Sequence, residues 1–169
     1  MTSYNNKTTT NTFDAAITHS IAPEMYMIAR LHGRGIMFHD DLTNSMVDVT
    51  EHLMTCGFNV TYAHTTLHEI SLLFHIDEQS YHRNPADIAA VLAGEASARL
   101  TYIMSQFATF DCTMVELANK KMVKEYFQLR SAEVDTINMW SYWESFEPGK
   151  RELVTVSNQE FQDTLNDFY

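Results

Sequence analysis

Residues 25–35 read MYMIARLHGRG, and residues 64–74 read HTTLHEISLLF. Residues 25–31 and 69–74 are nearly continuous apolar runs, which are typical of strands in the interior of a sheet. Gly33 and Gly35 end the first run, and an alternating segment at 58–63 precedes the second across a turn at Thr65 and Thr66. These stretches predict one strand followed, further along the chain, by a β-hairpin.

The segments around these strands complete the predicted order of elements. Apolar residues at helical spacing predict a helix from Asp41, and Asn84 followed by Pro85 predicts the start of a second helix. Residues 110–117 predict a fourth strand, and Asn119 precedes a third helix that extends through Ile137. A short strand is expected at 152–156. The predicted fold class is α+β: a ferredoxin-like, antiparallel four-stranded sheet (βαββαβ) with helices packed on one face, plus a C-terminal helix.

This topology predicts where a functional site would lie. The first and third strands are neighbours and run antiparallel, so the end of residues 25–31 meets the start of residues 69–74. His32 and His68 follow and precede these strands, so we expect them to lie close together.

The composition restricts the partners that the chain is expected to bind. The formal net charge is -11, and no run of Lys or Arg forms an evident basic patch, which disfavours a broad nucleic-acid surface. No apolar run is long enough for a membrane span or a signal peptide, so we expect a cytoplasmic protein that does not bind membranes. We expect a flexible arm at 1–20, one domain at 21–145 and a short extension at 146–169 packed on or near it.

Five segments in order resemble the palm domain of the tRNA-histidine guanylyltransferase family. IARLHGRG (28–35) resembles the family's strand that ends in Asp-Gly-Arg, and HTTLHEISLLF (64–74) resembles its Ser-Asp-Glu hairpin. The other segments are residues 81–100, 110–117 and 123–138. The resemblance implies a palm that adds nucleotides in the 3′-to-5′ direction with two metal ions, as ordinary polymerases do.

Departures from the family pattern fall on charged positions. The two metal-binding aspartates of the family correspond to His32 and His68, and a lysine that contacts triphosphate corresponds to Asp87. Hard Mg²⁺ prefers carboxylate oxygens, so these changes predict that the two-magnesium reaction is lost. The family's tRNA-handling part after the palm is also shortened, which together with the charge disfavours tRNA as a partner.

Several family residues are retained, and the resemblance implies roles for them. The residues expected to bind nucleotide or phosphate are Arg30, Gly33, Arg34, Arg83, Arg130 and Asn138. The candidates for catalysis are His32, His68 and Glu69. The implied ligands are GTP or ATP and a divalent metal ion.

Alternatives remain open at each of these positions. His32 and His68 can ligate a transition metal rather than Mg²⁺, completed by Glu69, Asp40 or His64, or can simply be hydrogen-bonded histidines. Arg34, Arg83 and Arg130 can form a phosphate cradle or ordinary salt bridges. His39–Asp40–Asp41 invites comparison with metal phosphohydrolases, but Asp41 fits a helix start better. Trp140, Tyr142 and Trp143 fit base stacking less well than core packing or an oligomer interface.

Three functions compete on these observations. The first is a palm domain without the two-magnesium reaction, acting as a nucleotide-binding, regulatory or assembly module. The second is an active nucleotidyltransferase or phosphohydrolase with a metal site rebuilt at His32 and His68. The third is a structural oligomer, and the resemblance implies a homodimer or homotetramer.

Overall fold

The computed structural model describes residues 19–36, 41–130, 137–143 and 151–157, together with residues 159, 160 and 163. Along the chain the elements are β1 (Tyr26–Arg34), α1 (Leu42–Thr55), β2 (Val60–Thr65), β3 (Glu69–Phe74), a 3₁₀ turn (Ser80–Arg83), α2 (Pro85–Met104), β4 (Thr109–Leu117), α3 (Lys120–Arg130), β5 (Ile137–Trp143) and β6 (Arg151–Val156).

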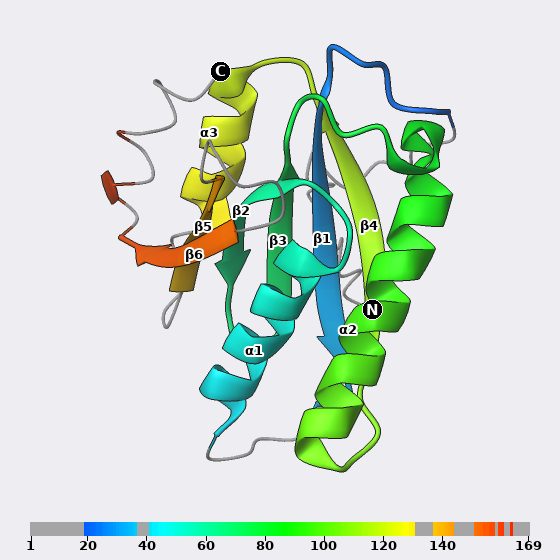
Figure 1. Cartoon of the computed structure of the whole chain (residues 1–169), viewed down its shortest axis with the longest axis vertical. Coiled ribbons are helices and arrows are strands. Elements are labelled where there is room, and N and C mark those ends of the chain that lie inside the picture. Colours follow the sequence, from blue (N-terminus) through cyan, green and yellow to red (C-terminus); the bar gives the residue numbers. More distant parts are fainter. Residues whose placement is uncertain are drawn as a thin grey trace, which may run out of the picture.

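All strands belong to one antiparallel sheet in the order β4-β1-β3-β2-β5-β6 (Figure 1). Its first four members form the predicted ferredoxin-like βαββαβ unit, with β1 between β3 and β4. The β5–β6 hairpin then extends this unit at β2, so the sheet has two more strands than the four predicted.

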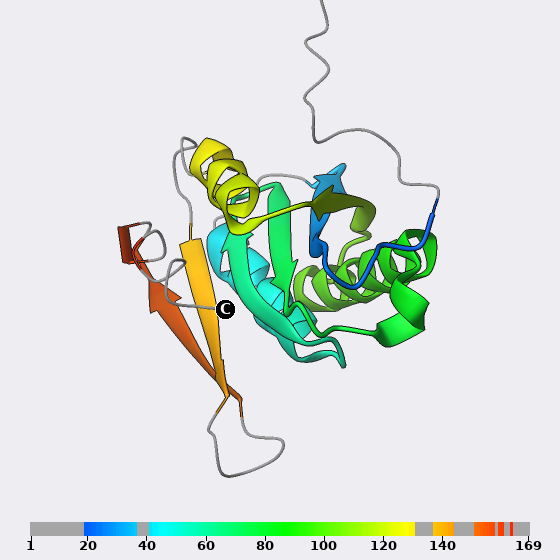
Figure 2. The same ribbon diagram turned by 90° about the horizontal axis from the view of Figure 1, so that it is seen from above.

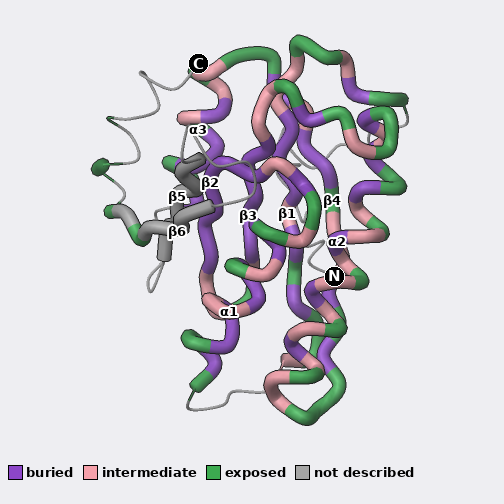
Figure 3. The backbone as a smooth tube through the Cα atoms, viewed as in Figure 1, coloured by how far each residue is buried: buried purple, intermediate pink, exposed green. Residues whose placement is uncertain are grey.

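Two apolar layers hold the helices against opposite faces of the sheet. Helices α1 and α2 share a core with Met27, Ala29 and Leu31 of β1, whereas α3 packs over Ile28 on the other face. Figure 2 shows α3 on the far side of the strands from α1 and α2. Because both faces of the central strands are covered, β2 is buried along its whole length despite its alternating sequence (Figure 3).

Local signals at the helix ends are confirmed. The side chain of Asn84 accepts hydrogen bonds from the backbone N–H groups of Ala86 and Asp87, at 3.0 Å and 3.2 Å, and Pro85 opens α2. Gly57, which follows α1, has a φ of +114°, a backbone conformation that residues other than glycine rarely adopt.

The third helix is shorter than predicted. It ends at Arg130, and Ile137 lies in β5 rather than on a helix. Residues 137–143 (INMWSYW) are rich in β-branched and aromatic residues, and pairing with β2 supplies the backbone hydrogen bonds of a strand. The short strand expected at 152–156 is confirmed as β6.

Two predictions concern segments that the structure covers only in part. Most of the arm expected at 1–20 lies outside the described residues, and so do His39 and Asp40. Over the part of the chain that is described, no helix combines the length and the apolar character needed to cross a bilayer.

Candidate nucleotide-binding site

The end of β1 meets the start of β3, as the topology predicts. The N–H of Gly33 donates to the carbonyl oxygen of His68 at 2.7 Å, and His32 stands opposite Glu69 in the β1–β3 ladder. Both histidines are exposed. The structure therefore brings all three predicted catalytic candidates to one end of the strand pair.

Gly33 lies in close packing at this end. A Cβ atom added there would lie 2.1 Å from Cδ1 of Ile36 and 3.3 Å from the ring of Phe110. A larger residue at position 33 would require the Ile36 side chain to turn away and the Phe110 ring to shift slightly.

Glu69 is the centre of a partly buried charge cluster. Arg30 donates from Nε to one carboxylate oxygen of Glu69 at 2.5 Å and from Nη2 to the other at 3.2 Å. This is a bidentate salt bridge across the β1–β3 ladder. Nη1 of Arg130, at the end of α3, lies 3.6 Å from the same carboxylate. Two predicted phosphate-binding arginines thus share one carboxylate.

The arginines keep this carboxylate ionised. Burial acts to raise the pKa of Glu69, but the hydrogen bond from Arg30 and the charges of Arg30, Arg130 and His32 outweigh it. The net result is a pKa below the ordinary value. Among the described residues, the cluster sets two guanidinium groups against one carboxylate.

Tyr126 and Ser71, which the sequence reasoning did not identify as site residues, hold Arg130 in place. The guanidinium of Arg130 lies 5.3 Å from the centre of the Tyr126 ring, and the Tyr126 hydroxyl and the Ser71 hydroxyl are 2.9 Å apart. Tyr126 and Arg130 are four residues apart on one helix face, a spacing that could have revealed their contact. Arg130 is only 9% exposed.

Arg34 lies beyond this cluster, at the open end of β1. Its guanidinium forms an ion pair with Asp111 of β4, and the Arg34 side chain is 70% exposed. Asp111 stands opposite His32 in the β1–β4 ladder, so it faces the same end of the sheet. Sequence reasoning placed Asp111 in a strand and missed this position, because only the pairing of β4 with β1 puts it beside His32.

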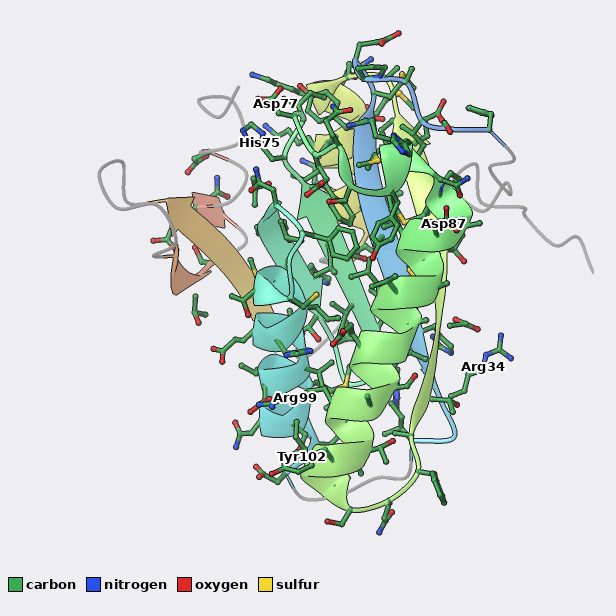
Figure 4. All side chains as sticks on the ribbon, turned by 45° about the vertical axis from the view of Figure 1, so that its right-hand side comes forward. Arg34, His75, Asp77, Asp87, Arg99 and Tyr102 are labelled. Carbon is green, nitrogen blue, oxygen red and sulfur yellow. The ribbon has the colours of Figure 1, made fainter. Side chains whose placement is uncertain are left out.

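Arg83 is not brought to this site. It is 2% exposed, and its guanidinium donates to the backbone carbonyl oxygens of Ile21, Ala22, Met25, Ile76 and Glu78. Met25 precedes β1, whereas His32 lies near its other end. Asp87, which follows Arg83 at the start of α2, is likewise far from Arg34 at the end of β1 (Figure 4).

Asn138 is connected to the site by strand register. Its Cα pairs with His64 of β2, which pairs with Ser71 of β3, and Ser71 pairs with Arg30. Asn138 therefore lies in the same cross-strand row as Arg30, with two strands between them.

The donor set does not fit the two magnesium ions that the resemblance implies. Imidazoles stand at both metal positions, and the nearby carboxylates of Glu69 and Asp111 are already engaged by arginines. Among the described residues, no three His, Cys, Asp or Glu side chains converge as metal ligands would.

Fold and site together define a palm-type domain. A sequence model of tRNAHis guanylyltransferase (Thg1) matches residues 7–134. The chain belongs to the tRNAHis guanylyltransferase family.

Solved structures share this fold. A bacterial tRNAHis guanylyltransferase (Thg1)-like protein in complex with GTP is 18% identical, with a TM-score of 0.71 over 89% of this chain and 92% of the other. The ATP complex of such a bacterial protein is 15% identical with the same TM-score, over 89% and 93%. The tRNAHis guanylyltransferase of Saccharomyces cerevisiae is 15% identical, with a TM-score of 0.56 over 68% of this chain and 60% of the other. No curated protein sequence is significantly similar to this chain.

Proposed function

We propose that this domain binds a nucleoside triphosphate at the end of β1 and β3 and does not carry out the two-magnesium nucleotidyl transfer of its family. In this role it serves as a nucleotide-binding, regulatory or assembly module. The ligand-contacting residues would be Arg30, Arg34 and Arg130, with Gly33 shaping the turn beside them.

The local charge balance carries this proposal. Among the described residues, the ion pairs of Arg30, Arg34 and Arg130 at this end of the sheet are with the carboxylates of Glu69 and Asp111. The described part of the site therefore carries an excess of positive charge, in a chain with a net charge of -11. Such a local excess attracts a phosphate group and repels a divalent cation.

GTP and ATP are both proposed ligands of this site. Bacterial relatives with the same fold form complexes with each of them. A site that binds the phosphates through arginines and makes few contacts with the base would accept both nucleotides.

Thermal unfolding and calorimetry with GTP and ATP test the proposal. Millimolar ligand is expected to raise the melting temperature, because a ligand that binds only the folded state stabilises it. Arg34→Ala is expected to weaken binding by about tenfold, the size of one charge-assisted hydrogen bond. Arg34 is exposed, so this variant should fold normally.

Arg99→Ala is the matched control for Arg34→Ala. Arg99 also pairs with an aspartate, Asp48, but this pair joins α2 to α1, which cover the opposite face of the sheet from α3 and Arg130. Equal weakening by both variants, or no binding by the parent protein, would contradict the proposed site.

A rebuilt metal site is the second candidate function. The observation that favours it is the meeting of two exposed histidines, His32 and His68, at one strand end. Imidazole nitrogens suit a transition metal better than Mg²⁺. Elemental analysis of protein purified without chelator, beside the His32→Ala/His68→Ala variant, tests it: one bound equivalent lost in the variant would support an enzyme with new metal chemistry.

A further inference from the structure

We infer that the ligand of this site is the magnesium-free form of a nucleoside polyphosphate, so that Mg²⁺ weakens binding instead of enabling it. This inference rests on the proposed function, since it specifies the chemical form of the nucleotide that the same residues hold.

A magnesium ion at this cluster would meet Glu69, whose carboxylate already binds Arg30. Glu69 is the only carboxylate in the β1–β3 ladder beside His32, and Arg30 occupies both of its oxygens at 2.5 Å and 3.2 Å. Coordination of Mg²⁺ by Glu69 would have to break this bidentate salt bridge. The displaced guanidinium, partly buried, would then face the cation without a counter-charge.

The guanidinium of Arg130 lies over the Tyr126 ring, and its ion pair among the described residues is with one oxygen of Glu69, at the long distance of 3.6 Å. Nε of Arg130 is buried and has no hydrogen-bond acceptor among the described residues. A buried charged donor that lacks an acceptor is costly, and a phosphate oxygen would satisfy it.

A triphosphate without Mg²⁺ presents more negative charge and more uncoordinated oxygens than its magnesium complex, in which the metal occupies oxygens of the β- and γ-phosphates. Guanidinium forks bind such free oxygens with two parallel hydrogen bonds. Three arginines therefore replace the charge neutralisation that two metal ions would supply.

Calorimetric titration of the full chain tests the inference with GTP, ATP and inorganic triphosphate. Each is measured in EDTA and in millimolar MgCl₂ at matched ionic strength, since screening alone weakens charge pairs. We expect dissociation constants at least about tenfold lower in EDTA, and inorganic triphosphate to bind within about tenfold of GTP. Tighter binding in MgCl₂, or equal affinities in both, would overturn the inference while leaving nucleotide binding intact.

A second readout uses a variant of Arg130 on α3. Arg130→Gln is expected to reduce the ratio of the two affinities toward one, because the charge that favours the metal-free ligand is removed. Arg99→Ala is expected to leave the ratio unchanged. An unchanged ratio in Arg130→Gln would contradict the assignment to this cluster, and absence of binding in both buffers would overturn the proposed function itself.

Discussion

Arg34 and Arg83 differ in what their guanidinium groups contact. Arg34 is exposed and pairs with one aspartate, whereas Arg83 is buried and, among the described residues, donates to backbone carbonyl groups. An arginine of the first kind can turn toward a ligand at little cost. An arginine of the second kind is part of the fold, because moving it would leave several buried carbonyl oxygens without hydrogen bonds.

Glu78 gives a prediction for acid stability. The carboxylate accepts from the backbone N–H groups of Asn59 at 2.5 Å and Ser80 at 2.7 Å. Burial acts to raise the pKa of Glu78, but hydrogen bonds from Ser80, Asn59 and Gln79 lower it further than burial raises it. A depressed pKa in the folded state means that Glu78 stabilises the fold above its unfolded pKa and loses this contribution as pH falls through the folded pKa.

Glu78→Gln should therefore be destabilised at neutral pH by about 1–2 kcal/mol, and by less in acid. Urea unfolding of the parent and the variant at pH 7 and near pH 3 measures the two differences. A difference that stays constant between the two pH values would show that the ionised form of Glu78 has no special role.

At the scale of elements, α3 connects the hydrophobic core to the charge cluster. Val123, Tyr126 and Phe127 anchor the helix on the sheet, and Arg130 follows one turn later at the same face. The ring of Tyr126 packs edge-on against Phe127 at 5.1 Å and carries the guanidinium of Arg130 on its face. The position of Arg130 therefore depends on packing that the helix makes with β2, β3 and β4.

The start of α2 gives an element-scale prediction. Asn84→Ala removes the side-chain acceptor for two helix N–H groups and should cost about 1 kcal/mol, since Ala cannot cap a helix. For a chain of this size that corresponds to a fall of about 2–4 °C in melting temperature. Asn84→Ser keeps an acceptor and should lie close to the parent; equal losses in both variants would show that the cap is not what Asn84 contributes.

At the scale of the whole molecule, Arg83 links segments that are distant in sequence. It binds the chain before β1 through Ile21 and Met25, and the loop after β3 through Ile76 and Glu78. The 3₁₀ turn that carries it has positive φ angles at Tyr81, His82 and Arg83, a costly conformation that these contacts help to maintain.

Arg83→Met should therefore destabilise the protein by about 3–5 kcal/mol, because buried acceptors lose a charged partner. Arg83→Lys should lie between the parent and Arg83→Met, and its folded fraction should bind nucleotide as the parent does. Equilibrium unfolding and calorimetry measure both properties. Weak nucleotide binding by folded Arg83→Lys would instead place Arg83 in the ligand site.

The sequence alone determined the order of the first strands and helices, since apolar periodicity, Asn84–Pro85 and the glycines after residue 31 act over short distances. It also determined that His32, His68 and Glu69 meet, because antiparallel pairing of β1 with β3 follows from the topology. Only the tertiary structure decided which arginines share a site. Helix orientation placed Arg130 at the carboxylate that Arg30 binds, and strand register placed Asp111 opposite His32. Burial held Arg83 beyond the other end of β1. These are properties of contacts between segments that are distant in sequence, and no local pattern encodes them.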